Sequence, residues 1–309
     1  MIKMKIFREY TEVDEFAPFC VALGSFDGVH KGHLRLMEAL KQNSETLGTR
    51  SMIYTFSNHP RKILAPDMPT YLITNNEKRA AIIGNLGIDV LFLEDFGNVM
   101  NMEAEDFIRK VLIDKFKVRC VIIGYNYRFG KCGEGCPEVM KEFGDKYGFK
   151  VEVIPAVEVN GETVSSSLIR HIIKSGEVDR IIEYLGRDYS IKGTVVYGKQ
   201  NGTAMGIRTA NLEIDKDMIL PKRGVYMTST VADGKTYKSV TNVGYNSTFD
   251  GVKLNVETHL IDFAGDIYEN QIEVFFLKRI RDEIKFPNVQ ELVTQIRQDI
   301  EIRLSYKCS

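Results

Sequence analysis

The stretch GSFDGVHKGH, residues 24–33, lies where a strand-like run, FCVALGSF, meets a helix-like run, GHLRLMEALKQ. Glycine occurs three times within it, and two histidines, His30 and His33, stand three positions apart. In open α/β sheets, ligands bind at the carboxyl ends of the strands, where such junctions occur. The stretch therefore bears on both the fold and the site.

The first half of the chain alternates short apolar runs with longer runs of helical spacing. The apolar runs are residues 19–25, 51–56, 88–94, 118–124 and 150–155. Predicted helices cover residues 33–42, 74–87 and 104–116. Thr74 and Glu77 have the spacing of a capping box at the start of the second helix. Strands that are apolar throughout and joined by helices predict an α/β domain with a doubly wound parallel sheet.

The rhythm changes near LGRDYSIKG, residues 185–193, after which strand-like segments follow one another with little helix between them. Their regular spacing predicts a small antiparallel β-barrel domain. Residues 286–304 then predict a C-terminal helix, which Asn288 and Glu291 would begin. The helix carries one apolar stripe: Val289, Leu292, Val293, Ile296 and Ile300. We place the domain boundary between residues 186 and 187, giving domains 1–186 and 187–309.

The composition is that of an ordinary globular protein of 309 residues, with 44% apolar and 27% charged residues. Its net charge of −1 gives no general attraction to nucleic acid or to an anionic membrane. No apolar run approaches the roughly 18 residues that a membrane span needs. The five cysteines and the charged N-terminus indicate a reducing compartment. We expect a cytoplasmic protein without nucleic-acid or membrane partners.

Three interpretations of GSFDGVHKGH compete. The histidines could share a metal ion, but no third ligand is near and the pattern is not HExxH. The stretch could also be a glycine-rich turn with two exposed imidazoles. Alternatively, Gly24 and Gly28 let the backbone approach an anion, while the helix starting near Lys31 directs its N–H groups at it. Imidazole donors there would stabilise charge during nucleotidyl transfer, with ATP consumed and pyrophosphate released.

A second motif, VSSSLIR at residues 164–170, supports the phosphate interpretation. Its serines and Arg170 could bind the leaving phosphates, with the arginine as a permanently charged clamp. The alternative is a serine that caps a helix, and the two roles are compatible because a helix N-terminus attracts anions. Cys132 and Cys136 have spacing loosely like half a zinc site, but no second pair follows.

Together, these motifs resemble the HxGH nucleotidyltransferases and, more narrowly, the bacterial bifunctional riboflavin kinase/FMN adenylyltransferases. TANL (209–212) and ETHLIDF (257–263) extend the resemblance over nearly the whole chain. It implies that the first domain joins FMN and ATP into FAD and pyrophosphate. It also implies that the second domain moves the γ-phosphate of ATP onto riboflavin, giving FMN and ADP.

The resemblance also implies roles for particular residues. His30 and His33 would be catalytic in the first domain, and Glu257 would be the general base of the second. Nucleotide and phosphate binding would fall to Gly24, Phe26, Asp27, Gly28, Ser165, Ser166, Arg170, Gly198 and Gly202. TFSNHP (55–60) and GYNYRFG (124–130) match elements near the flavin, contributing His59, Asn126 and Arg128. Thr209 and Asn211 would bind Mg²⁺ with ATP, since oxygen ligands suit this ion.

Several positions depart from the family pattern. Arg208 replaces the proline that precedes Thr209, Asn58 replaces another proline, and GKQNGTAMG (198–206) lacks the usual basic glycine loop. We expect both activities; the alternative is an FMN adenylyltransferase whose second domain binds flavin but phosphorylates poorly. A flavin-sensing or RNA-binding regulator is a further class. The near-neutral charge argues against RNA, and the intact catalytic set argues against a mere binder.

Overall fold

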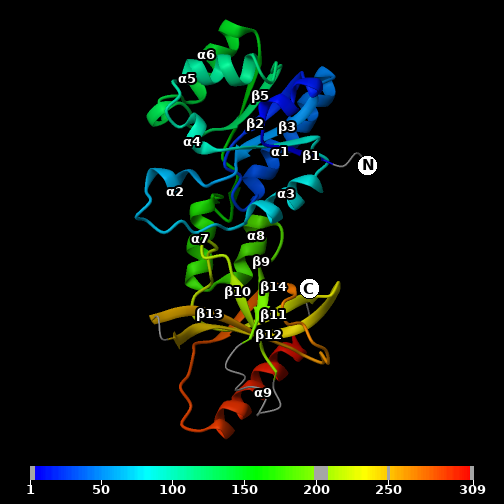
Figure 1. Ribbon diagram of the computed structural model, residues 1–309, viewed down its shortest axis with the longest axis vertical. Helices are drawn as coiled ribbons and strands as arrows, with labels where there is room; N and C mark the ends of the chain where they lie inside the picture. Colours follow the sequence, from blue (N-terminus) through cyan, green and yellow to red (C-terminus); the bar gives the residue numbers. More distant parts are fainter. Residues whose placement is uncertain (1–3, 198–207, 249–250, 307–309) are drawn as a thin grey trace. The chain divides into compact units, whose positions relative to one another are not determined.

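The computed structural model describes residues 4–197, 208–248 and 251–306 (Figure 1). The chain divides into two compact units, Met1–Ser166 and Ser167–Ser309. The first holds a parallel sheet and the second a closed antiparallel barrel followed by a C-terminal helix. The predicted fold class is confirmed.

The sheet of the first unit has strand order β1-β4-β3-β2-β5-β6, and all of its pairings are parallel. Its strands are β1 (Lys5–Phe7), β2 (Phe19–Leu23), β3 (Arg50–Phe56), β4 (Val90–Glu94), β5 (Cys120–Gly124) and β6 (Lys150–Ile154). Strands β3 and β4 lie on one side of β2 in the sheet, and β5 and β6 lie on the other. The order therefore reverses between β2 and β5, and the carboxyl ends of this pair form the switch point where such sheets bind ligands.

Helices pack on both faces of this sheet (Figure 1). Helices α1 (Lys31–Leu47) and α3 (Asn76–Gly84) belong to the core cluster on one face. Helices α5 (Ala104–Asp106) and α6 (Pro137–Tyr147) belong to the cluster on the other face, with α5 continuing into the π-helical Phe107–Ile113. The unit also contains the short helices α2 (Pro60–Leu64) and α4 (Phe96–Val99). Strand β2 shows why its sequence is apolar throughout. Phe19, Val21 and Leu23 join the cluster that includes the π-helical segment, whereas Cys20 and Ala22 join the cluster under α1.

Some local predictions for the first unit were wrong. Thr74 does not cap α3, because Asn75 is the N-cap residue and its side chain accepts the N–H of Lys78 at 2.9 Å. The Thr74 hydroxyl instead accepts the N–H of Gly28 at 3.0 Å. The short strands β1, β7 (Glu158–Val159) and β8 (Glu162–Thr163) were not predicted. Two or three residues carry too little periodicity to reveal a strand.

Helix α7 (Ser166–Ser175), which begins at the last residue of the first unit, and α8 (Ile181–Leu185) precede the barrel. The barrel has strand order β10-β13-β12-β11-β14-β9 and closes on itself. Its strands are β9 (Tyr189–Val196), β10 (Ala210–Ile214), β11 (Gly224–Ala232), β12 (Lys235–Thr248), β13 (Gly251–Leu260) and β14 (Gln271–Arg281). Along β13, Val256, Thr258 and Leu260 are buried and alternate with half-buried neighbours, so every second side chain faces the barrel interior.

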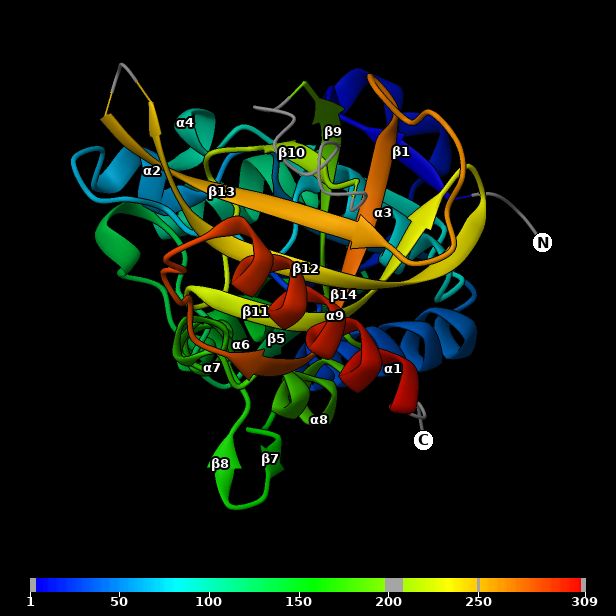
Figure 2. The ribbon, with the colours of Figure 1, turned by 90° about the horizontal axis from the view of Figure 1, so that it is seen from below.

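Helix α9 (Val289–Ser305) closes the chain and packs against β11 and β12 (Figure 2). Asn288 caps it as predicted, accepting the N–H of Glu291 at 2.9 Å. The predicted apolar stripe is not what is buried: Val289 is 56% exposed and the other four residues are half-buried. The fully buried side chains of the helix are Asp299 and Arg303, so polar contacts join the half-buried apolar residues in holding it.

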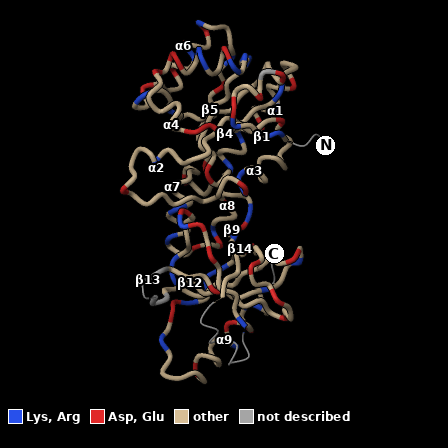
Figure 3. The backbone as a smooth tube through the Cα atoms, viewed as in Figure 1, with Lys and Arg blue, Asp and Glu red and all other residues tan. Residues whose placement is uncertain are grey.

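Acidic and basic residues are interspersed along the chain in both units (Figure 3). This distribution agrees with the near-zero net charge. Among the helices that the structure describes, none combines the length and the apolar character that crossing a membrane requires.

Candidate active sites

The turn after β2 has an unusual backbone. Phe26, Gly28 and Val29 have φ angles of 49°, 83° and 41°, which lie in the left-handed region. This region suits glycine but is rare for phenylalanine and for β-branched valine. A Cβ atom on Gly28 would also lie only 3.1 Å from the Ile73 side chain. The side chains of Phe26 and Val29 are fully buried in the core under α1, which anchors the turn from within.

His30 and His33 cap helix α1 by a reciprocal pair of hydrogen bonds. The Nδ1 atom of His30 accepts the N–H of His33 at 3.3 Å, and the Nδ1 atom of His33 accepts the N–H of His30 at 3.4 Å. The two rings stack with centroids 3.6 Å apart and planes inclined by 15°. This is the geometry of a capping box, built here from two imidazoles.

The hydrogen bonds of the cap determine which ring nitrogen of each histidine carries a hydrogen. An Nδ1 atom that accepts a hydrogen bond carries no hydrogen, so each neutral ring bears its hydrogen on Nε2. Both rings can thus offer an Nε2–H donor beside the N-terminus of α1. Gly32 makes the arrangement possible, because a Cβ atom there would lie 3.1 Å from the His30 ring.

The second motif reaches the same turn. The Ser166 hydroxyl, at the first residue of α7, donates to the backbone carbonyl of Asp27 at 2.9 Å, across 139 positions of sequence. Ser165 directly precedes it and is half-buried. Arg170 lies farther along α7, within the second unit. The structure thus joins GSFDGVHKGH to the start of VSSSLIR.

Two residues of the turn direct their side chains inward rather than to solvent. The Phe26 ring packs edge-on against His33, with centroids 5.1 Å apart. The Asp27 side chain is buried, and its carboxylate accepts the backbone N–H groups of Ile73 and Thr74 at 3.0 Å. Any contact of Phe26 or Asp27 with a nucleotide would therefore come from the backbone.

The residues matched to the flavin lie at the carboxyl ends of β3 and β5. Asn126 and Arg128 follow β5, next to the switch point, and both are exposed. His59 caps α2, with its Nδ1 atom accepting the N–H of Arg61 at 3.1 Å. Asn58, which replaces the family proline, donates to Asp95 and accepts from the N–H of Phe96. The first of these bonds is the main cause that lowers the pKa of Asp95.

In the second unit, Asn211 of β10 stands opposite Glu257 of β13 in the antiparallel register. Asn255 links them, since its Nδ2 atom donates to Asn211 Oδ1 at 3.1 Å and to a Glu257 carboxylate oxygen at 2.8 Å. Sequence reasoning missed Asn255. It stands two positions before Glu257, and strand alternation puts both on one face, which was the available signal.

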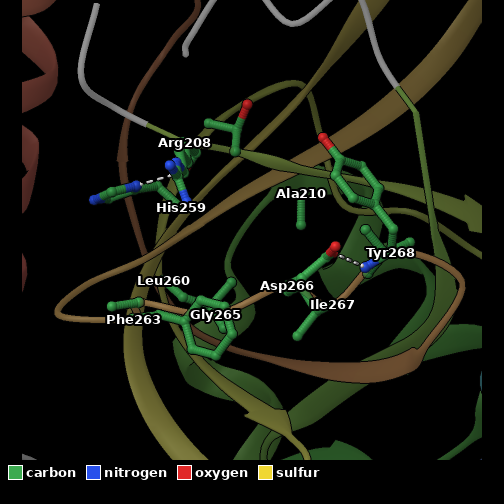
Figure 4. A pocket seen from close by; sticks show the side chains of 12 residues that line it. Arg208, Ala210, His259, Leu260, Phe263, Gly265, Asp266, Ile267 and Tyr268 are labelled. Carbon is green, nitrogen blue, oxygen red and sulfur yellow. Dashed lines mark hydrogen bonds between the residues drawn. The ribbon is translucent and has the colours of Figure 1, made fainter.

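A pocket of about 610 Å³ opens beside this cluster, between the start of β10 and the segment that joins β13 to β14 (Figure 4). Thr209 and Arg208 line it, and the His259 ring bonds the Arg208 carbonyl at 2.7 Å. Tyr268 lies across the pocket from His259 (Figure 4). Its ring stacks on Tyr197 with centroids 4.0 Å apart. Gly198 and Gly202 lie outside the described residues.

The two residues expected to bind Mg²⁺ offer hard oxygen atoms. They are Thr209, with a hydroxyl, and Asn211, with an amide oxygen, and ligands of this kind suit Mg²⁺ shared with phosphates. Among the residues that the structure describes, no group of three or more His, Cys, Asp or Glu side chains is arranged to hold a metal ion. The fit therefore rests on hydroxyl and amide oxygens.

Comparison with known families agrees with the division into two units. The FAD synthetase family model matches residues 13–168, and the riboflavin kinase model matches residues 185–306. A bifunctional riboflavin kinase/FMN adenylyltransferase of Bacillus subtilis is 33% identical, covering 95% of this chain and 94% of its own. One of Listeria monocytogenes is 31% identical, with coverages of 94% and 92%.

A solved structure shares the whole fold. The crystal structure of a protein from Streptococcus pneumoniae, named there a macrolide-efflux protein, matches with a TM-score of 0.90 and 29% sequence identity. The match covers 99% of this chain and 100% of the other. With both family models matched in order and the relatives aligned over nearly their full length, the chain belongs to the bifunctional riboflavin kinase/FMN adenylyltransferase family.

Proposed function

We propose that this chain makes FAD from riboflavin in two ATP-dependent steps. In residues 187–309, the riboflavin 5′-hydroxyl takes the γ-phosphate of ATP, giving FMN and ADP. In residues 1–186, the FMN phosphate attacks the α-phosphorus of a second ATP, giving FAD and pyrophosphate. Membership of the family supports both reactions.

The stacked histidine pair is the observation that carries the second step. Because backbone N–H groups donate to both Nδ1 atoms, the hydrogen of each neutral ring lies on Nε2, from which His30 and His33 can donate to phosphate oxygens. They and the N-terminal dipole of α1 stabilise the charge that builds on the α-phosphate during in-line attack. No protein nucleophile is needed, because the FMN phosphate oxygen attacks directly.

Other residues of the first domain bind the two substrates. The backbone of Gly24 and Gly28 approaches the nucleotide, and Ser165, Ser166 and Arg170 hold the departing pyrophosphate. The bond from Ser166 to the turn supports this arrangement, because it brings the two motifs within contact distance. His59, Asn126 and Arg128 receive the flavin at the carboxyl ends of β3 and β5.

In the kinase step, Glu257 removes the proton of the riboflavin hydroxyl as the oxygen attacks the γ-phosphorus. The O–P bond to the β-phosphate breaks, and ADP leaves. Asn255 holds the Glu257 carboxylate at 2.8 Å and so fixes the base. Thr209 and Asn211 would hold Mg²⁺ there, and Gly198 and Gly202 would approach the phosphates. When bound, the ion neutralises phosphate charge and orients the chain of phosphates.

One assay tests both steps. The purified protein is incubated with riboflavin, ATP and Mg²⁺, and the flavins are separated by chromatography. FAD formed from riboflavin is the expected result, and chelation of Mg²⁺ should abolish it. FAD formed only from added FMN would favour an adenylyltransferase whose second domain is a poor kinase. Absence of FMN and FAD in every mixture would overturn the proposal.

We further infer that the enzyme works in the cytoplasm, with riboflavin, FMN, FAD, ATP, ADP and pyrophosphate as its partners. The net charge of −1 supports the absence of nucleic-acid and membrane partners, because it gives no general attraction to either of these polyanions. Fractionation of cells that express the tagged chain would test the location.

A further inference from the structure

The turn after β2 is held in a costly conformation. A non-glycine residue in a sparsely populated backbone region is strained and persists only where its surroundings enforce that conformation. Phe26 and Val29 are two such residues. The burial of their side chains supplies part of the support, and helix α3 with the segment before it supplies the rest.

The segment before α3 and the turn after β2 exchange hydrogen bonds, each donating to the other. The Asp27 carboxylate, from the turn, accepts the N–H groups of Ile73 and Thr74, at 3.0 Å each. The Thr74 hydroxyl in return accepts the N–H of Gly28 at 3.0 Å. All of these groups are buried, where each hydrogen bond is stronger and each lost partner more costly than in water.

Arg79, on α3 itself, reaches behind the turn. Its side chain is 7% exposed. Its guanidinium donates to the Ser25 carbonyl at 2.6 Å and also to the Phe56 carbonyl. Ser25 belongs to the turn after β2, whereas Phe56 ends β3 and lies within the TFSNHP segment that carries His59. One rigid guanidinium therefore ties together the loops that follow two adjacent strands.

Burying the Arg79 guanidinium in this way adds little to the stability of the fold. Within the described residues, the Arg79 guanidinium donates to neutral acceptors: two backbone carbonyls and the Asn76 amide oxygen, the latter at 2.7 Å. Its Nε atom is buried and has no hydrogen-bond partner among those residues. Burial lowers the pKa of Arg79 to about 10, while the negative charge of Asp27 opposes that shift. The cation is thus retained at a folding cost, which points to a benefit elsewhere.

We propose that Arg79 is a positioning residue for adenylyl transfer. It fixes the spacing between the turn after β2, which receives the ATP phosphates, and the segment after β3, which receives the flavin. The inference rests on the proposed function, since it assigns the two substrates to those two loops. Misplacement of reacting groups by about 1 Å can cost roughly 10²-fold in rate. Loss of Arg79 should therefore lower kcat more than it raises either KM.

The test compares Arg79→Lys and Arg79→Met with the unaltered full-length protein. Arg79→Met should lower kcat for FAD formation from FMN about 10²-fold, with each KM changed less than about threefold. Arg79→Lys keeps the charge but reaches fewer acceptors, so it should recover part of kcat. FMN formation from riboflavin, measured in the same preparations, should stay within about twofold.

The matched control is Asp89→Asn. The Asp89 carboxylate accepts both the N–H and the hydroxyl of buried Ser51, at the opposite end of β3. This change also weakens a partly buried polar pair of the first unit. It should leave the kinetics of FAD formation unchanged at temperatures below the unfolding midpoint. If Arg79→Met does not fold, Arg79→Lys decides.

Unchanged kcat in the Arg79 variants that fold, or an effect on KM alone, would overturn the inference. If the unaltered protein made no FAD from FMN, the proposed function itself would fall. The two failures are therefore distinguishable.

Discussion

At the scale of single residues, each histidine at the start of α1 has two proposed roles: its Nδ1 atom accepts a backbone N–H group of the cap, and its Nε2–H group donates to the phosphate. His30→Ala should lower FAD formation from FMN by roughly 10²-fold or more, because one donor to the transferred phosphate is lost. It should also reduce stability by about 1 kcal/mol, because the cap on the His33 N–H is lost. Chromatography of flavins and urea denaturation measure the two effects.

The exposed histidine of α7 offers a control for that substitution. His171→Ala removes an imidazole that takes no part in the α1 cap and should leave the FAD rate unchanged. A His30→Ala enzyme with full FAD activity would show that the pair caps a helix and does nothing more.

Glu257 is the corresponding residue of the barrel. Glu257→Gln keeps the shape and the capacity to accept from Asn255 but removes the basic oxygen. Riboflavin phosphorylation should fall by about 10²–10⁴-fold, while FAD formation from FMN persists. Glu213→Gln alters an exposed carboxylate two positions after Asn211 on β10 and serves as the control. Equal kinase rates in the two variants would remove Glu257 as the base.

Asp188, directly before β9, gives a prediction for pH. Burial raises the pKa of its carboxyl above the ordinary value of 3.8. The stability this group contributes is complete below its unfolded pKa and is lost as pH rises through the folded pKa. Asp188→Asn should therefore raise the unfolding midpoint near pH 7. The gain should shrink as pH falls toward 3.8, and a gain independent of pH would contradict the burial argument.

At the scale of elements, α9 depends on polar anchors. Strand β11 changes register against β14 between Met227 and Thr228, and the Arg303 guanidinium donates to the Thr228 carbonyl at 2.7 Å. Arg303→Met should destabilise the barrel by about 1–3 kcal/mol, because a buried carbonyl loses its donor. Arg297→Met, on the exposed side of the same helix, should change little. Urea titration of kinase activity would compare them, and equal midpoints would refute the anchoring role.

The sequence revealed the elements whose periodicity is long. The buried runs of β2 to β6 and the strands of the barrel could be predicted because burial leaves a repeating pattern. The same reasoning predicted α9 and its apolar stripe, four of whose five residues are half-buried, but it did not predict that Asp299 and Arg303 are the fully buried side chains. A charged residue is normally assigned to the surface, and only its tertiary partners reveal otherwise. Arg281, 18 positions before Asp299, is one such partner.

The same distinction holds within the site. The histidine spacing and the glycines predict the turn, because all of these residues lie within one short stretch of the chain. Arg79 and Asn255 contact residues that are distant in the sequence, so local patterns did not reveal Arg79 and only weakly indicated Asn255. Thr74 shows the cost of purely local reasoning, since its hydroxyl accepts from Gly28 rather than from its own helix.

At the scale of the whole molecule, two unrelated architectures meet in one chain and both use ATP. In the mechanism we propose, the parallel sheet presents a helix N-terminus and paired imidazoles to an α-phosphate, whereas the barrel presents oxygen ligands and a carboxylate base for transfer of a γ-phosphate. Each proposed reaction then uses residues of its own unit, with the exception of the VSSSLIR motif. That motif begins in the first unit and continues along α7 into the second.

The position of α7 makes the domain boundary testable. Compactness alone divides the chain after Ser166, whereas we propose a boundary after residue 186, so that α7 and Arg170 belong to the adenylyltransferase. A fragment of residues 1–186 should make FAD from FMN. A fragment of residues 1–166 should lose most of that activity, because Ser166 would no longer begin a helix that aims its hydroxyl at the Asp27 carbonyl.

Circular dichroism would establish that each fragment is folded before rates are compared, and residues 1–175, which keep all of α7, form the intermediate control. The fragments 1–175 and 1–186 should be similar in rate, since both retain the motif and Arg170. Full activity in residues 1–166 would place the boundary at that residue. It would also exclude Arg170 from phosphate binding, because an arginine absent from the fragment cannot contribute to its rate.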